Sequence, residues 1–131
     1  MRVEGWEALL YEHIHQAHTT AFAWGTNDCA LWCSEWVRKA TGKDFGADWR
    51  GFYTSADELT ALLQARGYET ASDVAQDNLR HIPLSFTQRG DIVLHPQGCL
   101  GICDGLVSYF LMVDGVTRLH THHCRAAWKV E

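Results

Sequence analysis

The chain has 131 residues, of which 47% are hydrophobic and 21% are charged. This length fits one domain spanning residues 1–131 and leaves no room for a second. The formal net charge is −5 and Lys and Arg form no runs, so we expect no nucleic acid as a partner. No apolar run is long enough for a transmembrane segment, and the amphipathic N-terminal residues predict no signal peptide.

Helical periodicity dominates the first half of the chain. Apolar residues on one stripe predict a helix over about residues 4–18. A second stripe, with spacings of three and four, begins at Cys29, and Gly42 marks its end. Asn27 or Asp28 is expected to cap the N-terminus of this second helix.

An irregular stretch over residues 43–54 separates these helices from the next. Ser55-Ala56-Asp57-Glu58 then has the pattern of a capping box and predicts a helix that ends at Gly67. A shorter helix is expected over residues 72–79, before Pro83 interrupts the helical pattern.

Three aromatic residues occur in the irregular stretch, namely Trp49, Phe52 and Tyr53. Aromatic side chains anchor many interfaces, so we predict that these three line a groove or face a partner. The alternative is that they cover the core.

The pattern changes to that of strands in the second half. Asp104-Gly105 and Asp114-Gly115 are typical hairpin turns and would join consecutive antiparallel strands. The predicted strands cover residues 92–95, 99–103, 106–112 and 116–121. We therefore predict an α+β fold in which helices come first and an antiparallel β-meander follows.

Cys29 is the first candidate for chemistry, because it lies at the predicted N-terminus of a helix. Unpaired backbone N–H groups and the helix dipole stabilise a thiolate there. A cysteine hydrolase would use this thiolate as its nucleophile, with a His as the base and a third polar group that orients the His. Asp28 is a candidate for capping and orienting, although its charge disfavours the thiolate. Alternatively, Cys29 is the first core residue of its helix.

Several segments resemble NlpC/p60-like proteins, a branch of the papain-like cysteine peptidase superfamily. Residues 22–29, which end in Asp28-Cys29, are similar to the nucleophile segment of this branch. Gly90-Asp91 resembles the start of its first core strand, and residues 99–103 resemble the next strand. The resemblance covers most of the chain and implies a minimal papain-like fold, in which a Cys-bearing helix packs on a small antiparallel meander.

A short phage tail-module branch is more similar still. Its members pair Trp-Gly-x-x-Asp-Cys with a Leu-Gly-Ile-Cys strand, here residues 24–29 and 100–103, and with a Trp near the C-terminus, here Trp128. The resemblance implies a tail-tip or tail-assembly protein, made in the bacterial cytoplasm and carried in the virion. Other phage tail proteins would be its partners, and peptidoglycan peptides would be the substrate of an active member.

The position of the family's catalytic His is occupied by Cys99, and a thiol cannot serve as the usual imidazole base. His95, His120 and His122 are the alternative candidates for the base. His120 or His122 would reach Cys29 if the last predicted strand neighbours the strand of Cys99. The competing interpretation is that these His side chains face solvent and that the protein is a catalytically degenerate structural plug or adaptor of the tail tip.

The N-terminal histidines His13, His15 and His18 spread around their predicted helix. Because they do not share one face, we expect them on the surface.

A metal-stabilised tail protein is a further alternative. A zinc ion or an iron–sulfur cluster would be held by soft ligands that converge from the second helix and the strands. The candidate ligands are Cys29, Cys33, Cys99, Cys103 and Cys124, with His122 nearby. The competing interpretation is that these cysteines are packing residues of a small core, so that no cofactor is expected.

Overall fold

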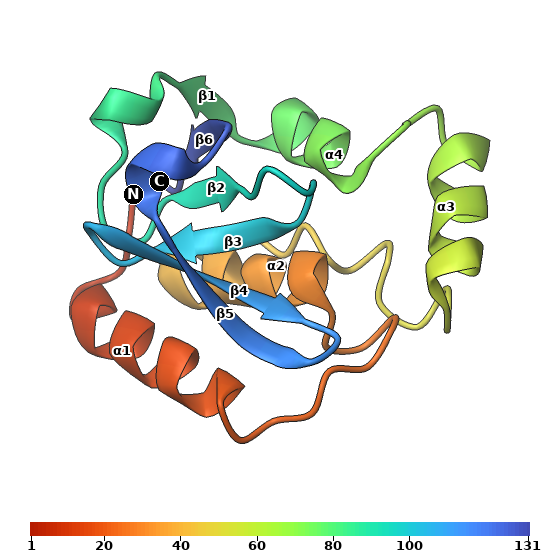
Figure 1. Cartoon of the computed structure of the whole chain (residues 1–131), viewed down its shortest axis with the longest axis horizontal. Coiled ribbons are helices and arrows are strands. Elements are labelled where there is room, and N and C mark those ends of the chain that lie inside the picture. Colours follow the sequence, from red (N-terminus) through yellow and green to blue (C-terminus); the bar gives the residue numbers. More distant parts are fainter.

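The computed structural model describes all 131 residues and has an α+β fold, as predicted (Figure 1). The helices are α1 (Trp6–Ala17), α2 (Cys29–Thr41), α3 (Ala56–Ala65) and α4 (Ala71–Asn78). The strands are β1 (Arg80–Ile82), β2 (Ile92–Leu94), β3 (Leu100–Cys103), β4 (Val107–Met112), β5 (Gly115–His120) and β6 (Ala126–Lys129). Two 3-10 turns cover Leu84–Phe86 and Thr121–His123.

The six strands form one antiparallel sheet in the order β1-β6-β2-β3-β4-β5. Strands β2 to β5 are the predicted meander, and the two Asp-Gly turns join β3 to β4 and β4 to β5. The sequence pattern does not predict β1 or β6. Strand β6 returns from the end of the chain to lie between β1 and β2, where Trp128 is opposite Ile92.

Both faces of the central strands are buried. Helix α2 packs against β3 and β4, and α1 packs against α2, so the larger core lies on this face. Trp36 of α2 is fully buried there, and its indole nitrogen donates to the carbonyl of Gly90 at 2.8 Å. The smaller core on the opposite face consists of Ile82, Val93, Cys103, Phe110, Cys124 and Ala127.

Helices α3 and α4 lie on one side of the molecule, away from α1 (Figure 1). They contribute little to the core, since only Leu63 of α3 and Ala75 of α4 are buried. The predicted cap of α3 is present: the Ser55 hydroxyl accepts from the backbone N–H of Glu58. These two helices and the irregular stretch before them therefore form a peripheral layer beside the sheet.

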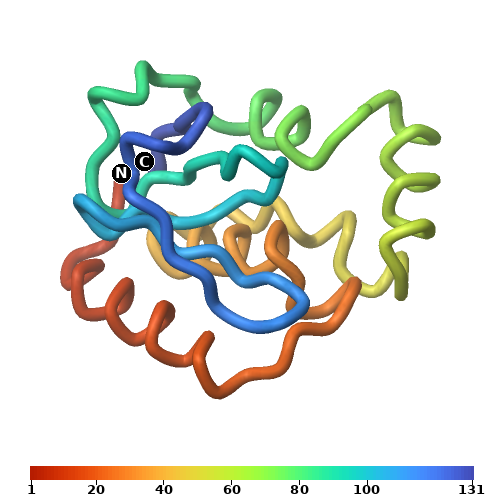
Figure 2. The backbone as a smooth tube through the Cα atoms, viewed as in Figure 1, coloured from red at the N-terminus to blue at the C-terminus, as the bar shows by residue number.

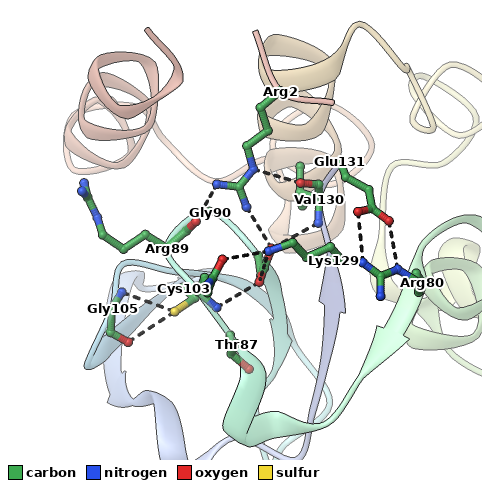
Figure 3. A network of polar contacts seen from close by, with 12 residues as sticks. Arg2, Arg80, Thr87, Arg89, Gly90, Cys103, Gly105, Lys129, Val130 and Glu131 are labelled. Carbon is green, nitrogen blue, oxygen red and sulfur yellow. Dashed lines mark hydrogen bonds and ion pairs between the residues drawn. The ribbon is translucent and has the colours of Figure 1, made fainter. Parts of the chain in front are cut away.

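The two ends of the chain lie next to each other (Figure 2). The buried carboxylate of Asp91 joins them, because it accepts from Arg2 Nη2 at 2.9 Å and from the backbone N–H of Val130 at 3.2 Å. The backbone N–H of Gln88 donates to its second oxygen at 2.9 Å, and Lys129 Nζ lies 3.5 Å away. Figure 3 shows Arg2, Lys129 and Val130 close together in this network. Asp91 thus fixes the entry to β2 against both termini.

The prediction for the N-terminal histidines is wrong at His13. This side chain is only 4% exposed, and its ring stacks on Trp32 of α2 at 5.3 Å. His15 and His18 are exposed, as expected. His13 lies one turn below Leu10 on the face of α1 that meets α2, and the aromatic ring of Trp32 gives it an apolar surface to pack on.

None of the helices is both long enough and apolar enough to span a membrane.

Candidate functional site

Cys29 begins α2, and the carboxylate of Asp28 caps this helix. One oxygen of Asp28 accepts from the backbone N–H of Leu31 at 3.0 Å. The other accepts from the backbone N–H of Gly25 at 3.0 Å and from the Tyr53 hydroxyl. The Asp28 side chain is fully buried and has a partner on each oxygen, so it holds the turn before Cys29 in place.

Gly25 is the residue that lets this turn approach Tyr53. Its φ of +79° lies in the left-handed region that glycine adopts readily. A Cβ at this position would lie 1.8 Å from the carbonyl oxygen of Tyr53. The Trp-Gly-x-x-Asp-Cys pattern therefore has a conformational reason: glycine permits the turn and Asp28 closes it.

Cys99, which immediately precedes β3, is the thiol that affects the pKa of Cys29 most. A hydrogen bond from Cys99 lowers the pKa of Cys29, and backbone hydrogen bonds at Leu100 and Ala30 act in the same direction. Burial and the charge of Asp28 oppose this effect. The same hydrogen bond and burial raise the pKa of Cys99, so Cys29 is the more acidic thiol of the pair.

His95 lies after β2, and its ring turns toward the smaller core. The ring meets Phe110 edge to face at 4.9 Å, and Phe110 belongs to the core on the side opposite α2. The backbone N–H of Gln97 donates to Nδ1 of His95 at 3.0 Å. The neutral ring therefore carries its proton on Nε2, and its one basic nitrogen is already engaged.

His120 and His122 are exposed at the far side of the meander. His120 ends β5, whereas His122 lies in the following 3-10 turn. Strand β4 separates β5 from β3, so the last predicted strand does not neighbour that of Cys99. Their rings contact each other and His123, with centroids 4.1–6.0 Å apart. No hydrogen bond joins any histidine to Cys29, which leaves all three base candidates as predictions.

The five cysteines do not converge on one point. Cys33 is buried in the core beneath α2, where burial raises its pKa well above the ordinary value. Cys103 and Cys124 belong to the core on the opposite face of the sheet. No group of three or more Cys, His, Asp or Glu side chains is arranged to hold a metal ion. All five thiols are free.

Tyr53 is the residue of this site whose role the sequence pattern did not reveal. It is 2% exposed, which agrees with the alternative that the aromatic residues of this stretch cover the core, and its hydroxyl donates to Asp28. Burial and the bond to Asp28 raise the pKa of Tyr53 well above its usual range. An isolated Tyr in an irregular stretch gives no sign of its partner, because that partner lies 25 residues earlier.

Comparison with known families gives one match. Residues 1–130 match the family described as a domain of unknown function, DUF6950. The chain belongs to this family. The match covers the helices, the whole sheet and the pair formed by Cys29 and Cys99, so the site is part of the family's domain. No curated protein matches the chain.

Proposed function

We propose that this DUF6950 protein is a component of a phage tail tip that keeps an NlpC-type scaffold for assembly and does not hydrolyse peptide bonds. The observation that carries the proposal is the place of the candidate bases: His95 packs against Phe110 of the smaller core, and β4 separates the strand of His120 from β3. The resemblance of residues 22–29 and 90–103 to the tail-module branch supports the assignment to a tail.

Peptide hydrolysis needs a base that takes the thiol proton and then returns it to the leaving amine. Cys99 is a poor candidate for this role, because its pKa is raised above that of an ordinary thiol and its Sγ donates to the backbone carbonyl of Leu100. Asp28 cannot orient a distant His either, since both of its oxygens bind the turn and Tyr53. The pair can hold a thiolate but has no group that shuttles the proton.

The second candidate is a peptidoglycan-directed cysteine hydrolase, which the acidity of Cys29 favours. Its pKa is lowered, and it lies at the N-terminus of α2, where backbone N–H groups would stabilise an oxyanion. This candidate requires a base from outside the observed contacts, such as His95 after its ring turns away from Phe110.

Digestion of purified peptidoglycan separates the two candidates. The wild type and Cys29→Ala would each be incubated with peptidoglycan, and released peptides would be measured by mass spectrometry. We expect no release by the wild type or by Cys29→Ala. Release by the wild type that Cys29→Ala abolishes, with an unchanged melting temperature, would establish the hydrolase instead.

The assignment to a tail needs a separate experiment. In a phage that carries this gene, we expect the protein in purified particles, defective tails after deletion of the gene, and full rescue by Cys29→Ala. Particles that lack the protein and remain fully infective without the gene would overturn the tail proposal, whatever the outcome of the digestion.

A further inference from the structure

A groove lies between the irregular stretch after α2 and the helices α3 and α4, in the peripheral layer. Its volume is about 440 Å³. It adjoins a mainly apolar cavity of about 80 Å³ that reaches toward the sheet. The residues that line both spaces are Phe45, Trp49, Val74 and Asn78. A ligand in the groove can therefore extend an apolar group into the cavity.

The groove presents aromatic rings, as predicted for Trp49 and Phe52. The guanidinium of Arg66 stacks over Trp49 at 4.6 Å and over Phe52 at 5.4 Å, and Tyr68 meets Trp49 at 6.0 Å. Phe52 is nevertheless 61% exposed. Ring faces carry partial negative charge, so they attract the C–H groups of a ligand that lies flat on them.

The charges that line the groove cancel. Arg66 makes no ion pair, and its side chain donates one hydrogen bond, to the backbone carbonyl of Asp48 at 2.6 Å. The carboxylate of Asp48 has no hydrogen-bond partner either, whereas that of Asp44 is paired with Arg50 at 3.2 Å. One unpaired cation and one unpaired anion therefore line the groove, which suits a neutral ligand better than an ion of either sign.

The groove offers both hydrogen-bond donors and hydrogen-bond acceptors to a neutral ligand. Four N–H donors of Arg66 have no acceptor, because a guanidinium has five such donors and one is used. Asp48 offers acceptor oxygens, and so does Asn78, whose amide NH₂ is bonded to Val74 at 2.8 Å. A hydroxyl group both donates and accepts, so it satisfies either side.

We infer that this groove binds a neutral oligosaccharide that contains an N-acetylated amino sugar. The sugar C–H face lies on the exposed ring of Phe52, its hydroxyls bind Asp48 and Arg66, and its acetamido methyl enters the cavity past Val74. A cavity of about 80 Å³ has room for such a small group, since an engineered apolar cavity of about 150 Å³ binds benzene. The inference does not depend on the proposed function, because binding is measured on the isolated chain.

Titration with two matched trisaccharides tests the inference. N,N′,N″-Triacetylchitotriose, called chitotriose below, carries acetamido groups, whereas cellotriose has hydroxyls at the same positions. We expect saturable shifts of the Trp49 indole signal in NMR spectra with chitotriose, and binding of cellotriose that is at least about tenfold weaker. Equal affinity for both sugars would overturn the role of the cavity, and no binding of either would overturn the site.

Three variants locate the bound sugar. Phe52→Ala and Asp48→Asn change exposed side chains of the groove, and each is expected to weaken chitotriose binding about three- to tenfold. Phe86→Ala is the matched control, because Phe86 is a similarly exposed ring (69%) in the 3-10 turn after β1. Unchanged affinity of both groove variants, or an equal loss in Phe86→Ala, would show that the sugar binds elsewhere and would overturn the inference.

Discussion

His13 should make the stability of this protein depend on pH. Its Nδ1 accepts from Lys39 Nζ at 3.1 Å, and because an ammonium can only donate, the ring proton lies on Nε2. Nε2 in turn donates to the carbonyl of Trp32 at 2.9 Å. The neutral ring thus has a partner on each nitrogen. A second proton would break the bond from Lys39 and place two positive charges next to each other.

Burial lowers the pKa of His13 from 6.5 to about 4, and the charge of Lys39 acts in the same direction. The bond to Trp32 and the charge of Glu35 oppose this effect. His13 is therefore protonated below pH 6.5 in the unfolded chain, but only below about pH 4 in the folded chain. Stability falls as the pH falls through this window, by about 1.4 kcal/mol per pH unit. The loss is about 2 kcal/mol at pH 5 and reaches about 3 kcal/mol below pH 4.

Urea unfolding of the wild type and His13→Gln between pH 7.5 and 4.5 measures this effect. Glutamine can donate to Trp32 and accept from Lys39 but does not titrate. We expect the wild type to lose about 2 kcal/mol relative to His13→Gln between pH 7.5 and pH 5. His18→Gln, at an exposed position of the same region, should follow the wild type. A difference between wild type and His13→Gln that stays constant with pH would refute the reasoning.

Three further outcomes follow from the buried contacts. Asp91→Ala should lower the free energy of unfolding by about 3–5 kcal/mol, because it removes the anion of a buried network. Arg80→Ala breaks an exposed ion pair and should leave the melting temperature almost unchanged, so similar melting temperatures of the two variants would contradict this. Tyr53→Phe should cost about 1.5–3 kcal/mol in urea unfolding, since the Asp28 carboxylate loses a donor, and wild-type stability would exclude that role. Brief treatment with iodoacetamide at pH 7 should label Cys29 before the buried Cys33, and mass spectrometry that finds the reverse order would contradict the lowered pKa of Cys29.

The local elements of the fold could be predicted from the sequence, and the long-range ones could not. The apolar stripe, the Asp28 cap and Gly42 predict helix α2, and all of these signals lie within 15 residues. The two Asp-Gly turns predict the meander. Strands β1 and β6 have three and four residues, and they pair with each other across about 45 residues of chain. No turn links them, so periodicity alone does not reveal them.

The candidate site likewise has a local part that the sequence predicts and a long-range part that it does not. The sequence places Cys29 at a helix N-terminus, and the structure agrees, because this depends on neighbouring residues only. The predicted meander already places the strand over residues 106–112 between those of Cys99 and His120, and the structure has this order. The direction in which His95 points depends on a ring contact with Phe110, which lies two strands away from β2.

The motifs Asp28-Cys29 and Gly90-Asp91 have the same physical role. Asp28 and Asp91 are both fully buried carboxylates, and each accepts from at least two backbone N–H groups. Asp28 fixes the turn into α2, and Asp91 fixes the entry to β2 and both termini. Replacing a carboxylate in such a position lowers the stability of the fold, because buried backbone N–H groups lose their acceptor. Selection for the fold alone is therefore enough to keep both motifs, whether or not Cys29 reacts. A resemblance that rests on Asp28-Cys29 and Gly90-Asp91 does not by itself indicate hydrolysis, which has to be tested at the sulfur of Cys29.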